Sequence, residues 1–307
     1  MAPALGGSHV TPIQLSLPSP LEPLDLIPGM KLWVKRDDLI HPIISGNKWR
    51  KLEGFFHQLD RHRSILTFGG AYSNHLPAVA CAAHQLNHRC ILIVRGEELS
   101  SSSNPILQYC AELGASLFFV SREDYLKLRF RQWQPTLHQL RCWDAENATI
   151  LPEGGAGVHV VRGCQRLWTE LSAELAPAHI VIAAGTGATA SGLLSAMPRG
   201  ASVKLHVISA LRAAKRERAM VKRLAAQRAL SLHWEDELYF GGYGRKTEVL
   251  LRLSADFKQA SGFPVDLTYN AKVWAYLKRT PLEGQVVWVH SGGFRPPAPL
   301  INKDGSS

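Results

Sequence analysis

Short apolar segments alternate with amphipathic segments along most of this 307-residue chain. The apolar segments, such as residues 64–70 (SILTFGG) and 90–96 (CILIVRG), have the length of buried strands. Between them, segments such as residues 74–86 and 104–115 are amphipathic and have the length of helices. Apolar strands separated by helices are typical of a mostly parallel sheet that is covered on both faces. We therefore predict an α/β fold.

The alternation falls into two series. The second series contains apolar strands at residues 179–185, 203–211 and 286–293. We predict a small domain of residues 54–148 and a large domain of residues 1–53 plus 149–307. Ligands of open α/β sheets bind beyond the carboxyl ends of the strands, so we expect a site where these ends of both domains face each other.

Charge and cysteine content narrow the functional classes. The net charge of +10 could attract nucleic acid, but the densest basic stretch, residues 212–228, has Ala, Val and Leu on one side at helical spacing. We interpret it as a solvated helix face, with attraction of an anionic substrate or phosphate as the alternative, and expect neither nucleic-acid nor membrane partners. The five cysteines form no CxxC pair and no secretory signal is recognisable, so we expect a cytoplasmic protein.

A glycine loop lies between an apolar strand and a helix. It consists of Gly185, Thr186, Gly187, Ala188 and Thr189. Backbone N–H groups in such a loop converge on an anion, and the helix N-terminus adds about half a positive charge. The next glycine, Gly192, comes too late for a dinucleotide fingerprint, and no Gly-Lys-Ser/Thr follows. The loop indicates a phosphate monoester; an ordinary tight turn is the alternative.

Lys48 lies in the segment SGNKWRKLE, where a loop becomes a helix. Ser45 and Asn47 are expected to cap that helix. Partial burial against Trp49 and Phe55 would lower the basicity of the amine, as a lysine that reacts with an aldehyde requires. A surface lysine at a helix start is the alternative.

The segment GGAYSNHLPA places Ser73, Asn74 and His75 at the start of a helix, after a strand that ends in glycines. The serine hydroxyl and the free N–H groups of the first turn could hold a carboxylate. Capping by the serine and the asparagine alone would explain the same pattern.

Two tyrosines, Tyr243 and Tyr269, stand in polar contexts where either could carry a proton or orient a ligand; packing in the core is the alternative. His84 and His88 are four residues apart, a spacing that can bind a metal ion. The sequence offers them no third ligand, so we expect no metal site.

Taken in order, these segments resemble the 1-aminocyclopropane-1-carboxylate (ACC) deaminase and D-cysteine desulfhydrase family of fold-type II enzymes, which depend on pyridoxal 5′-phosphate (PLP). The resemblance covers residues 32–293 through the segments VKRDD, SGNKWRKLE, GGAYSNH, LPEGGA followed by VRG, AAGTGATASGL, TYNAK and HSGG. It implies a tryptophan synthase β-like architecture with two open twisted mostly parallel sheets covered by helices. It also implies a homodimer.

The resemblance implies a role for each matching residue. Lys48 would form the Schiff base with PLP and transfer the substrate proton, and residues 185–189 would bind the phosphate. Asn74 would contact the 3′-oxygen of PLP, and Ser291 would contact its pyridine nitrogen.

The residues around the substrate are implied in the same way. Ser73 would bind the carboxylate of a small amino acid or take part in proton transfer, together with Asn74 and His75. Tyr269 would lie over the substrate and Tyr243 would lie near it.

The chain departs from the family after Tyr269. ACC deaminases carry a glutamate at the next position and the desulfhydrases usually a threonine, whereas this chain has Asn270. A D-cysteine desulfhydrase-like β-elimination to pyruvate, ammonia and sulfide is therefore expected before ACC deamination. A nucleotide-binding oxidoreductase and a binding protein without turnover are the alternatives from other classes.

Overall fold

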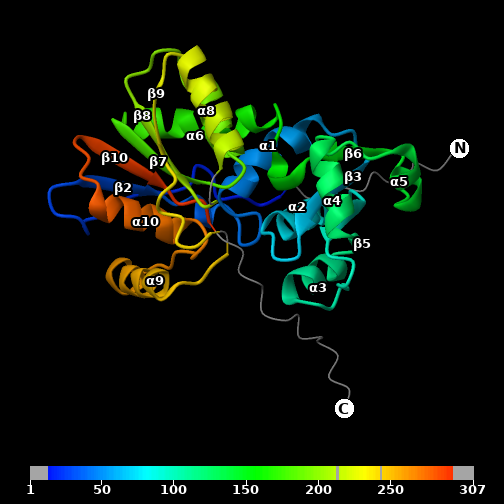
Figure 1. Cartoon of the computed structure of the whole chain (residues 1–307). Helices are drawn as coiled ribbons and strands as arrows, with labels where there is room; N and C mark the ends of the chain where they lie inside the picture. Colours follow the sequence, from blue (N-terminus) through cyan, green and yellow to red (C-terminus); the bar gives the residue numbers. More distant parts are fainter. Residues whose placement is uncertain (1–12, 212–213, 243, 293–307) are drawn as a thin grey trace, which may run out of the picture.

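Two sheets of mostly parallel strands, covered by helices, make up the protein (Figure 1). The computed structural model describes residues 13–211, 214–242 and 244–292. One sheet has six strands in the order β1-β2-β10-β7-β8-β9, and the other has four in the order β5-β4-β3-β6. Every described strand pair is parallel except β1 with β2. The predicted α/β class with two mostly parallel sheets is confirmed.

The six-stranded sheet is buried on both faces because successive side chains of a strand point to opposite sides. Ile180 and Ile182 of β7 pack into one apolar cluster, and Val181 and Ala183 pack into another. The strands are β1 (Leu21–Pro23), β2 (Lys31–Lys35), β7 (His179–Ala184), β8 (Lys204–Ser209), β9 (Ser231–Glu235) and β10 (Gln285–Val289). The first cluster includes residues of helices α6 (Val160–Glu174), α7 (Ala188–Ala196) and α8 (Lys215–Gln227), and the second of α9 (Glu248–Ser261) and α10 (Asn270–Arg279).

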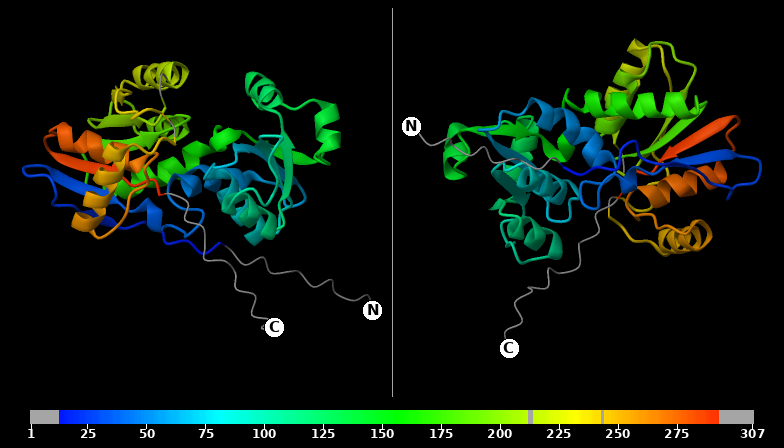
Figure 2. Two further views of the ribbon diagram at one scale, coloured as in Figure 1. Left: turned by 60° about the horizontal axis from the view of Figure 1, so that its bottom comes forward. Right: turned by 180° about the vertical axis from the view of Figure 1, so that it is seen from behind.

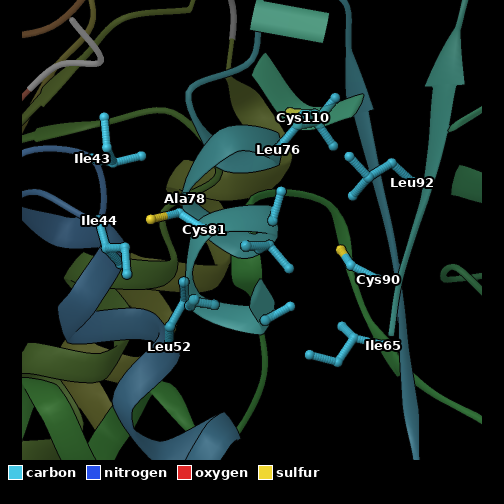
Figure 3. Packing of buried hydrophobic residues seen from close by; sticks show 14 of the residues in the cluster. Ile43, Ile44, Leu52, Ile65, Leu76, Ala78, Cys81, Cys90, Leu92 and Cys110 are labelled. Atoms are coloured by element: carbon cyan, nitrogen blue, oxygen red, sulfur yellow. The ribbon is translucent and has the colours of Figure 1, made fainter. Parts of the chain in front are cut away.

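The four-stranded sheet forms a separate lobe (Figure 2). Its strands are β3 (Ser64–Gly70), β4 (Cys90–Arg95), β5 (Ser116–Val120) and β6 (Ala148–Leu151). The helices of this part of the chain are α1 (Asn47–Gln58), α2 (His75–Gln85), α3 (Pro105–Glu112), α4 (Arg122–Phe130) and α5 (Leu137–Cys142). Figure 3 places α2 between the strands that carry Ile65 and Leu92 and the helix that carries Leu52. The predicted domain boundary at residue 148 falls on β6 and stays a prediction.

Helix α1 crosses α6 at very short range. A Cβ atom on Gly54 would lie 2.1 Å from the carbonyl oxygen of His159, and one on Gly163 would lie 2.1 Å from that of Arg50. The two glycines therefore allow the backbones of α1 and α6 to touch. This contact fixes the helix that begins beside Lys48.

A buried network of ion pairs also holds helix α1 in place. Arg50 is fully buried, and its Nη2 lies 2.8 Å from Oδ1 of Asp37 and 2.8 Å from Oε2 of Glu170. Lys35 on β2 lies 3.1 Å from Glu170 and 2.9 Å from Glu174. The network joins β2, the 3-10 helix η1 (Asp37–Leu39), α1 and α6.

The basic stretch near residue 220 is a solvated helix face over its described residues, as predicted. Lys215 and Lys222 of α8 are exposed, whereas Val221 and Ala225 are buried. The five cysteines are free thiols, and Cys142 is the exposed one. Within the described residues, no helix has both the length and the apolar character needed to cross a bilayer.

Candidate active site

Helix α1 begins at a glycine and not at a capping side chain. Gly46 is the N-cap with φ 61°, and a Cβ atom there would lie 1.8 Å from the carbonyl oxygen of Ser291. The predicted caps, Ser45 and Asn47, make no side-chain cap bond, so that prediction is wrong. The reason is local: the carbonyl of Ser291 already accepts from the N–H of Asn47 at 3.3 Å. Oδ1 of Asn47 instead accepts from Nζ of Lys48 at 2.7 Å.

Two lysines one turn apart on α1 have lowered basicity. Burial lowers the pKa of Lys48 to about 8, and the charge of Asp266 opposes the shift. Burial and then the charge of Lys48 lower the pKa of Lys51 to about 7. Nζ of Lys51 donates to the carbonyl oxygen of Gly154 at 3.0 Å. Sequence reasoning missed Lys51, although its three-residue spacing from Lys48 predicts the same helix face.

The lowered pKa predicts how the chain reacts with an aldehyde. Only the neutral amine attacks, and with a pKa of about 8 for Lys48 the neutral fraction rises about tenfold between pH 7 and pH 9. We expect the rate at which PLP loads onto the cofactor-free protein to rise by that factor and then level off. Stopped-flow absorbance measures this rate. A rate that keeps rising tenfold per pH unit beyond pH 9 would indicate an ordinary lysine.

The glycine loop fits a phosphate. Gly187 is the N-cap of α7 with φ 73°, so the first N–H groups of that helix have no intrahelical partner. Oγ1 of Thr186 is buried and has no hydrogen-bond partner among the described residues. Gly154, whose carbonyl holds Lys51, is so close that a Cβ there would lie 3.4 Å from this oxygen. An unsatisfied hydroxyl, free N–H groups and a nearby amine are what an anionic oxygen requires.

The predicted carboxylate cradle lies at the start of α2. The N–H of Ser73 donates to the carbonyl oxygen of Gly70 at 2.9 Å, and the N–H of His75 donates to Oγ of Ser73 at 3.2 Å. Asn74 is the N-cap, and its side chain makes no cap bond. Ser73 and Asn74 are both half-buried.

His75 points its ring into the lobe. Nε2 lies 2.9 Å from Oγ1 of Thr67, which itself donates to the carbonyl oxygen of Leu151 at 2.8 Å. Burial, and after it the charges of Lys51 and Lys48, hold the pKa of His75 well below its usual value. The bond to Thr67 occupies Nε2, so a substrate contact by this ring would use Nδ1. The predicted contact stays a prediction.

Asp266 organises the opposite side of the site. Its carboxylate accepts from the N–H of Tyr269 at 2.7 Å and from Nδ2 of Asn270 at 2.6 Å. Asn270 is fully buried, and its Nδ2 also lies 3.2 Å from Oγ of Ser291. A Cβ atom on Gly185 would lie 3.2 Å from the hydroxyl of Tyr269. Sequence reasoning missed Asp266, although it stands three residues before Tyr269.

The structure thus brings the start of α1, the glycine loop, Tyr269 and Ser291 close together. The carbonyl of Ser291 contacts the start of α1 next to Lys48. Lys51 donates to Gly154, and Gly154 lies close to Thr186 of the glycine loop. Gly185 lies next to the hydroxyl of Tyr269, and the side chain of the following residue, Asn270, lies next to that of Ser291. These contacts do not include Ser73, Asn74 or His75. Tyr243 lies outside the described residues.

The histidine pair of the predicted helix makes separate backbone contacts. Nδ1 of His84 lies 3.0 Å from the carbonyl oxygen of Leu113, and Nδ1 of His88 lies 3.1 Å from that of Arg63.

The family model described as "Pyridoxal-phosphate dependent enzyme" matches residues 13–292. The chain belongs to this family. It is 26% identical to the bifunctional D-cysteine desulfhydrase/ACC deaminase of Arabidopsis thaliana over 95% of this chain and 82% of that protein. It is also 26% identical to the D-cysteine desulfhydrase of Klebsiella pneumoniae subsp. pneumoniae, over 91% of this chain and 92% of that protein.

Two solved structures share the fold of this chain. An ACC deaminase homologue superimposes with a TM-score of 0.76 over 92% of this chain and 91% of that chain, at 23% identity. An L-serine ammonia-lyase of Rhizomucor miehei gives 0.63 over 90% and 93%, at 15% identity. The predicted fold-type II architecture is confirmed, and PLP is the cofactor of the family. The oxidoreductase alternative is thereby set aside.

Proposed function

We propose that this PLP enzyme catalyses β-elimination from a small amino acid, with D-cysteine as the first candidate substrate. The names of its relatives support this proposal, and so does the uncharged pair Asn270–Ser291 beside Lys48. PLP, when bound, withdraws electrons from the α-carbon of the amino acid, and the protein supplies binding, orientation and proton transfer.

The proposed roles follow the contacts. Lys48 would carry the cofactor and move the α-proton, because its lowered pKa makes a larger fraction of the amine neutral at pH 7 than in an ordinary lysine. The loop of residues 185–189 and the amine of Lys51 would hold the phosphate. Asn74 would contact the 3′-oxygen. Ser73 would bind the substrate carboxylate, with Tyr269 over the substrate.

Asn270 is the residue that favours β-elimination over opening of the ACC ring. Its Nδ2 has three acceptors within reach: Oδ2 of Asp266 at 2.6 Å, the carbonyl oxygen of Gly292 at 3.1 Å and Oγ of Ser291 at 3.2 Å. When Nδ2 donates to Oγ of Ser291, the hydroxyl hydrogen is available for another group. Ser291 would offer the pyridine nitrogen of PLP a neutral hydroxyl, which would favour an unprotonated nitrogen and so a weaker electron sink than a carboxylate would. Elimination suits such a ring because the leaving group removes the negative charge. Opening of the ACC ring offers no such leaving group.

The proposed reaction balances without an oxidant. The α-proton passes to Lys48, the carbon–sulfur bond breaks, and hydrosulfide leaves with the bonding electrons. The enamine that is released takes up one water molecule and gives pyruvate and ammonia. In sum, D-cysteine and water yield pyruvate, ammonia and hydrogen sulfide.

The test is a screen of both enantiomers of cysteine and serine, together with ACC, against the purified holoenzyme. We expect D-cysteine to release pyruvate and sulfide in equal amounts, with at least a tenfold higher kcat/KM than ACC, which corresponds to about 1.4 kcal/mol in the transition state. Release of 2-oxobutyrate from ACC at a comparable kcat/KM would overturn the choice made from Asn270. No turnover of any amino acid would overturn the proposed function.

A homodimer and a cytoplasmic location are part of the same proposal. The family resemblance supports the first, and the reduced, unpaired cysteines are compatible with the second. Sedimentation equilibrium of the holoenzyme measures the oligomeric state.

A further inference from the structure

Lys272 on α10 is a buried cation held by backbone carbonyls. The residue is 1% exposed. Its ammonium group donates to the carbonyl oxygens of Ala210 at 3.0 Å, Tyr239 at 2.9 Å and Gly242 at 3.3 Å. An ammonium group has three N–H donors and no acceptor, so these three oxygens use its full capacity. No carboxylate lies within ion-pair distance of it in the described part of the chain.

A buried charge is costly unless it is well coordinated. Burial lowers the pKa of Lys272 to about 8, and the charge of Asp266 opposes the shift, so the amine stays mostly protonated at neutral pH. Shells of backbone carbonyl oxygens are also how proteins coordinate free monovalent cations. Lys272 supplies the same charge at the end of a side chain.

The carbonyls come from segments that lie far from α10 in the sequence. Ala210 directly follows β8, and the other two belong to the turn after β9, from which the chain runs past α10 to α9 (Figure 1). This turn holds consecutive residues at positive φ: Phe240 at 47°, Gly241 at 85° and Gly242 at 118°. A phenylalanine in that region is strained and persists only where its surroundings hold it.

The contacts of Lys272 reach the active site on two sides. The N–H of Ala210 donates to the carbonyl oxygen of Ala184, the residue before the glycine loop, at 2.8 Å. Asn270, which holds Ser291, precedes Lys272 by two residues on the same helix. We propose that Lys272 is a built-in cation that holds the turn of residues 239–242 against the carboxyl edge of the six-stranded sheet, and so positions one wall of the active site.

The test is chemical rescue of Lys272→Ala in the holoenzyme. This variant removes the ammonium and leaves room for a small cation next to the carbonyls. We expect proteolytic cleavage between residues 236 and 246 to become about tenfold faster, because hydrogen bonds from a charged donor are lost. Ethylammonium should restore the wild-type rate, and tetramethylammonium at the same ionic strength should not, because it has no N–H donor.

Lys272→Met is the matched variant, since its side chain fills the space and carries no charge. We expect faster cleavage that ethylammonium does not reverse. The exposed Lys258→Ala should cleave like the wild type. Wild-type cleavage in Lys272→Ala, or equal rescue by both cations, would overturn the proposal.

Two further measurements test the role of Lys272 if Lys272→Ala does not fold. In the wild type, acetic anhydride should modify Lys258 and spare Lys272; equal modification would contradict the carbonyl cage. In Lys272→Met, KM for the substrate should rise more than kcat falls while PLP content is unchanged. The KM measurement rests on the proposed function, whereas the cleavage and modification experiments do not. A failure of the proposal for Lys272 can therefore be told apart from a failure of the proposed function.

Discussion

Lys48→Ala is expected to abolish turnover, lowering kcat by at least about a thousandfold. The reason is that one amine is proposed both to carry the cofactor and to move the α-proton. The same variant should lose the visible absorption band of the wild type, because PLP would no longer be attached. Pyruvate release and the absorption spectrum of the purified protein measure the two effects.

Two control variants separate attachment from phosphate binding. Lys258→Ala on α9 should behave like the wild type, because Lys258 is exposed. Lys51→Ala should keep the absorption band but bind PLP more weakly. The reason is that Lys51 donates to the carbonyl of Gly154, which lies close to Thr186 of the glycine loop. Undiminished turnover in Lys48→Ala would refute the proposed mechanism.

Arg50→Met is expected to destabilise the protein by about 3–5 kcal/mol, because it leaves Asp37 without its buried cationic partner and Glu170 with Lys35 alone. Loss of the Arg50 guanidinium should also shift Lys48, which precedes it by two residues on α1. Urea denaturation of the holoenzyme measures the change in the free energy of unfolding.

The control for this variant is Arg252→Met on α9. Arg252 pairs with Glu248, but both side chains are exposed, so no measurable change is expected. A loss below about 1 kcal/mol in Arg50→Met would show that the network does not hold α1 in place.

The sequence predicted the fold class because buried parallel strands are continuous apolar runs, as in residues 64–70 and 90–95. It did not predict β9 or α10. β9 (SLHWE) is short and partly polar. The carboxylate that accepts from the first N–H groups of α10 belongs to Asp266, which stands three residues before the N-cap. The N-cap itself, Tyr269, makes no side-chain cap bond.

The site was predicted in part for a similar reason. Lys48, Ser73 and the glycine loop stand at the ends of recognisable elements, so their position made them candidates. The resemblance to the family then implied their roles. Lys51, Asp266 and Lys272 act through tertiary contacts with residues far away in the sequence, such as the bond from Lys51 to Gly154. The wrong assignment of Ser45 and Asn47 as caps has the same origin, because the carbonyl of Ser291 occupies that space.

Two lysines of α1, Lys48 and Lys51, have pKa values low enough for either to attach PLP. Lys51 is less basic than Lys48, with values of about 7 and about 8, so basicity alone would favour Lys51 as the attacking amine. Its Nζ is directed at the carbonyl oxygen of Gly154, whereas Nζ of Lys48 contacts only the neighbouring Asn47 among the described residues. We therefore assign the attachment of PLP to Lys48.

The most direct test is to reduce the holoenzyme with borohydride, which makes the bond between lysine and PLP permanent, and to map the modified peptide by mass spectrometry. The account predicts one pyridoxyl phosphate group per chain, located on Lys48. Modification of Lys51, or a chain that carries no such group after incubation with PLP, would contradict it.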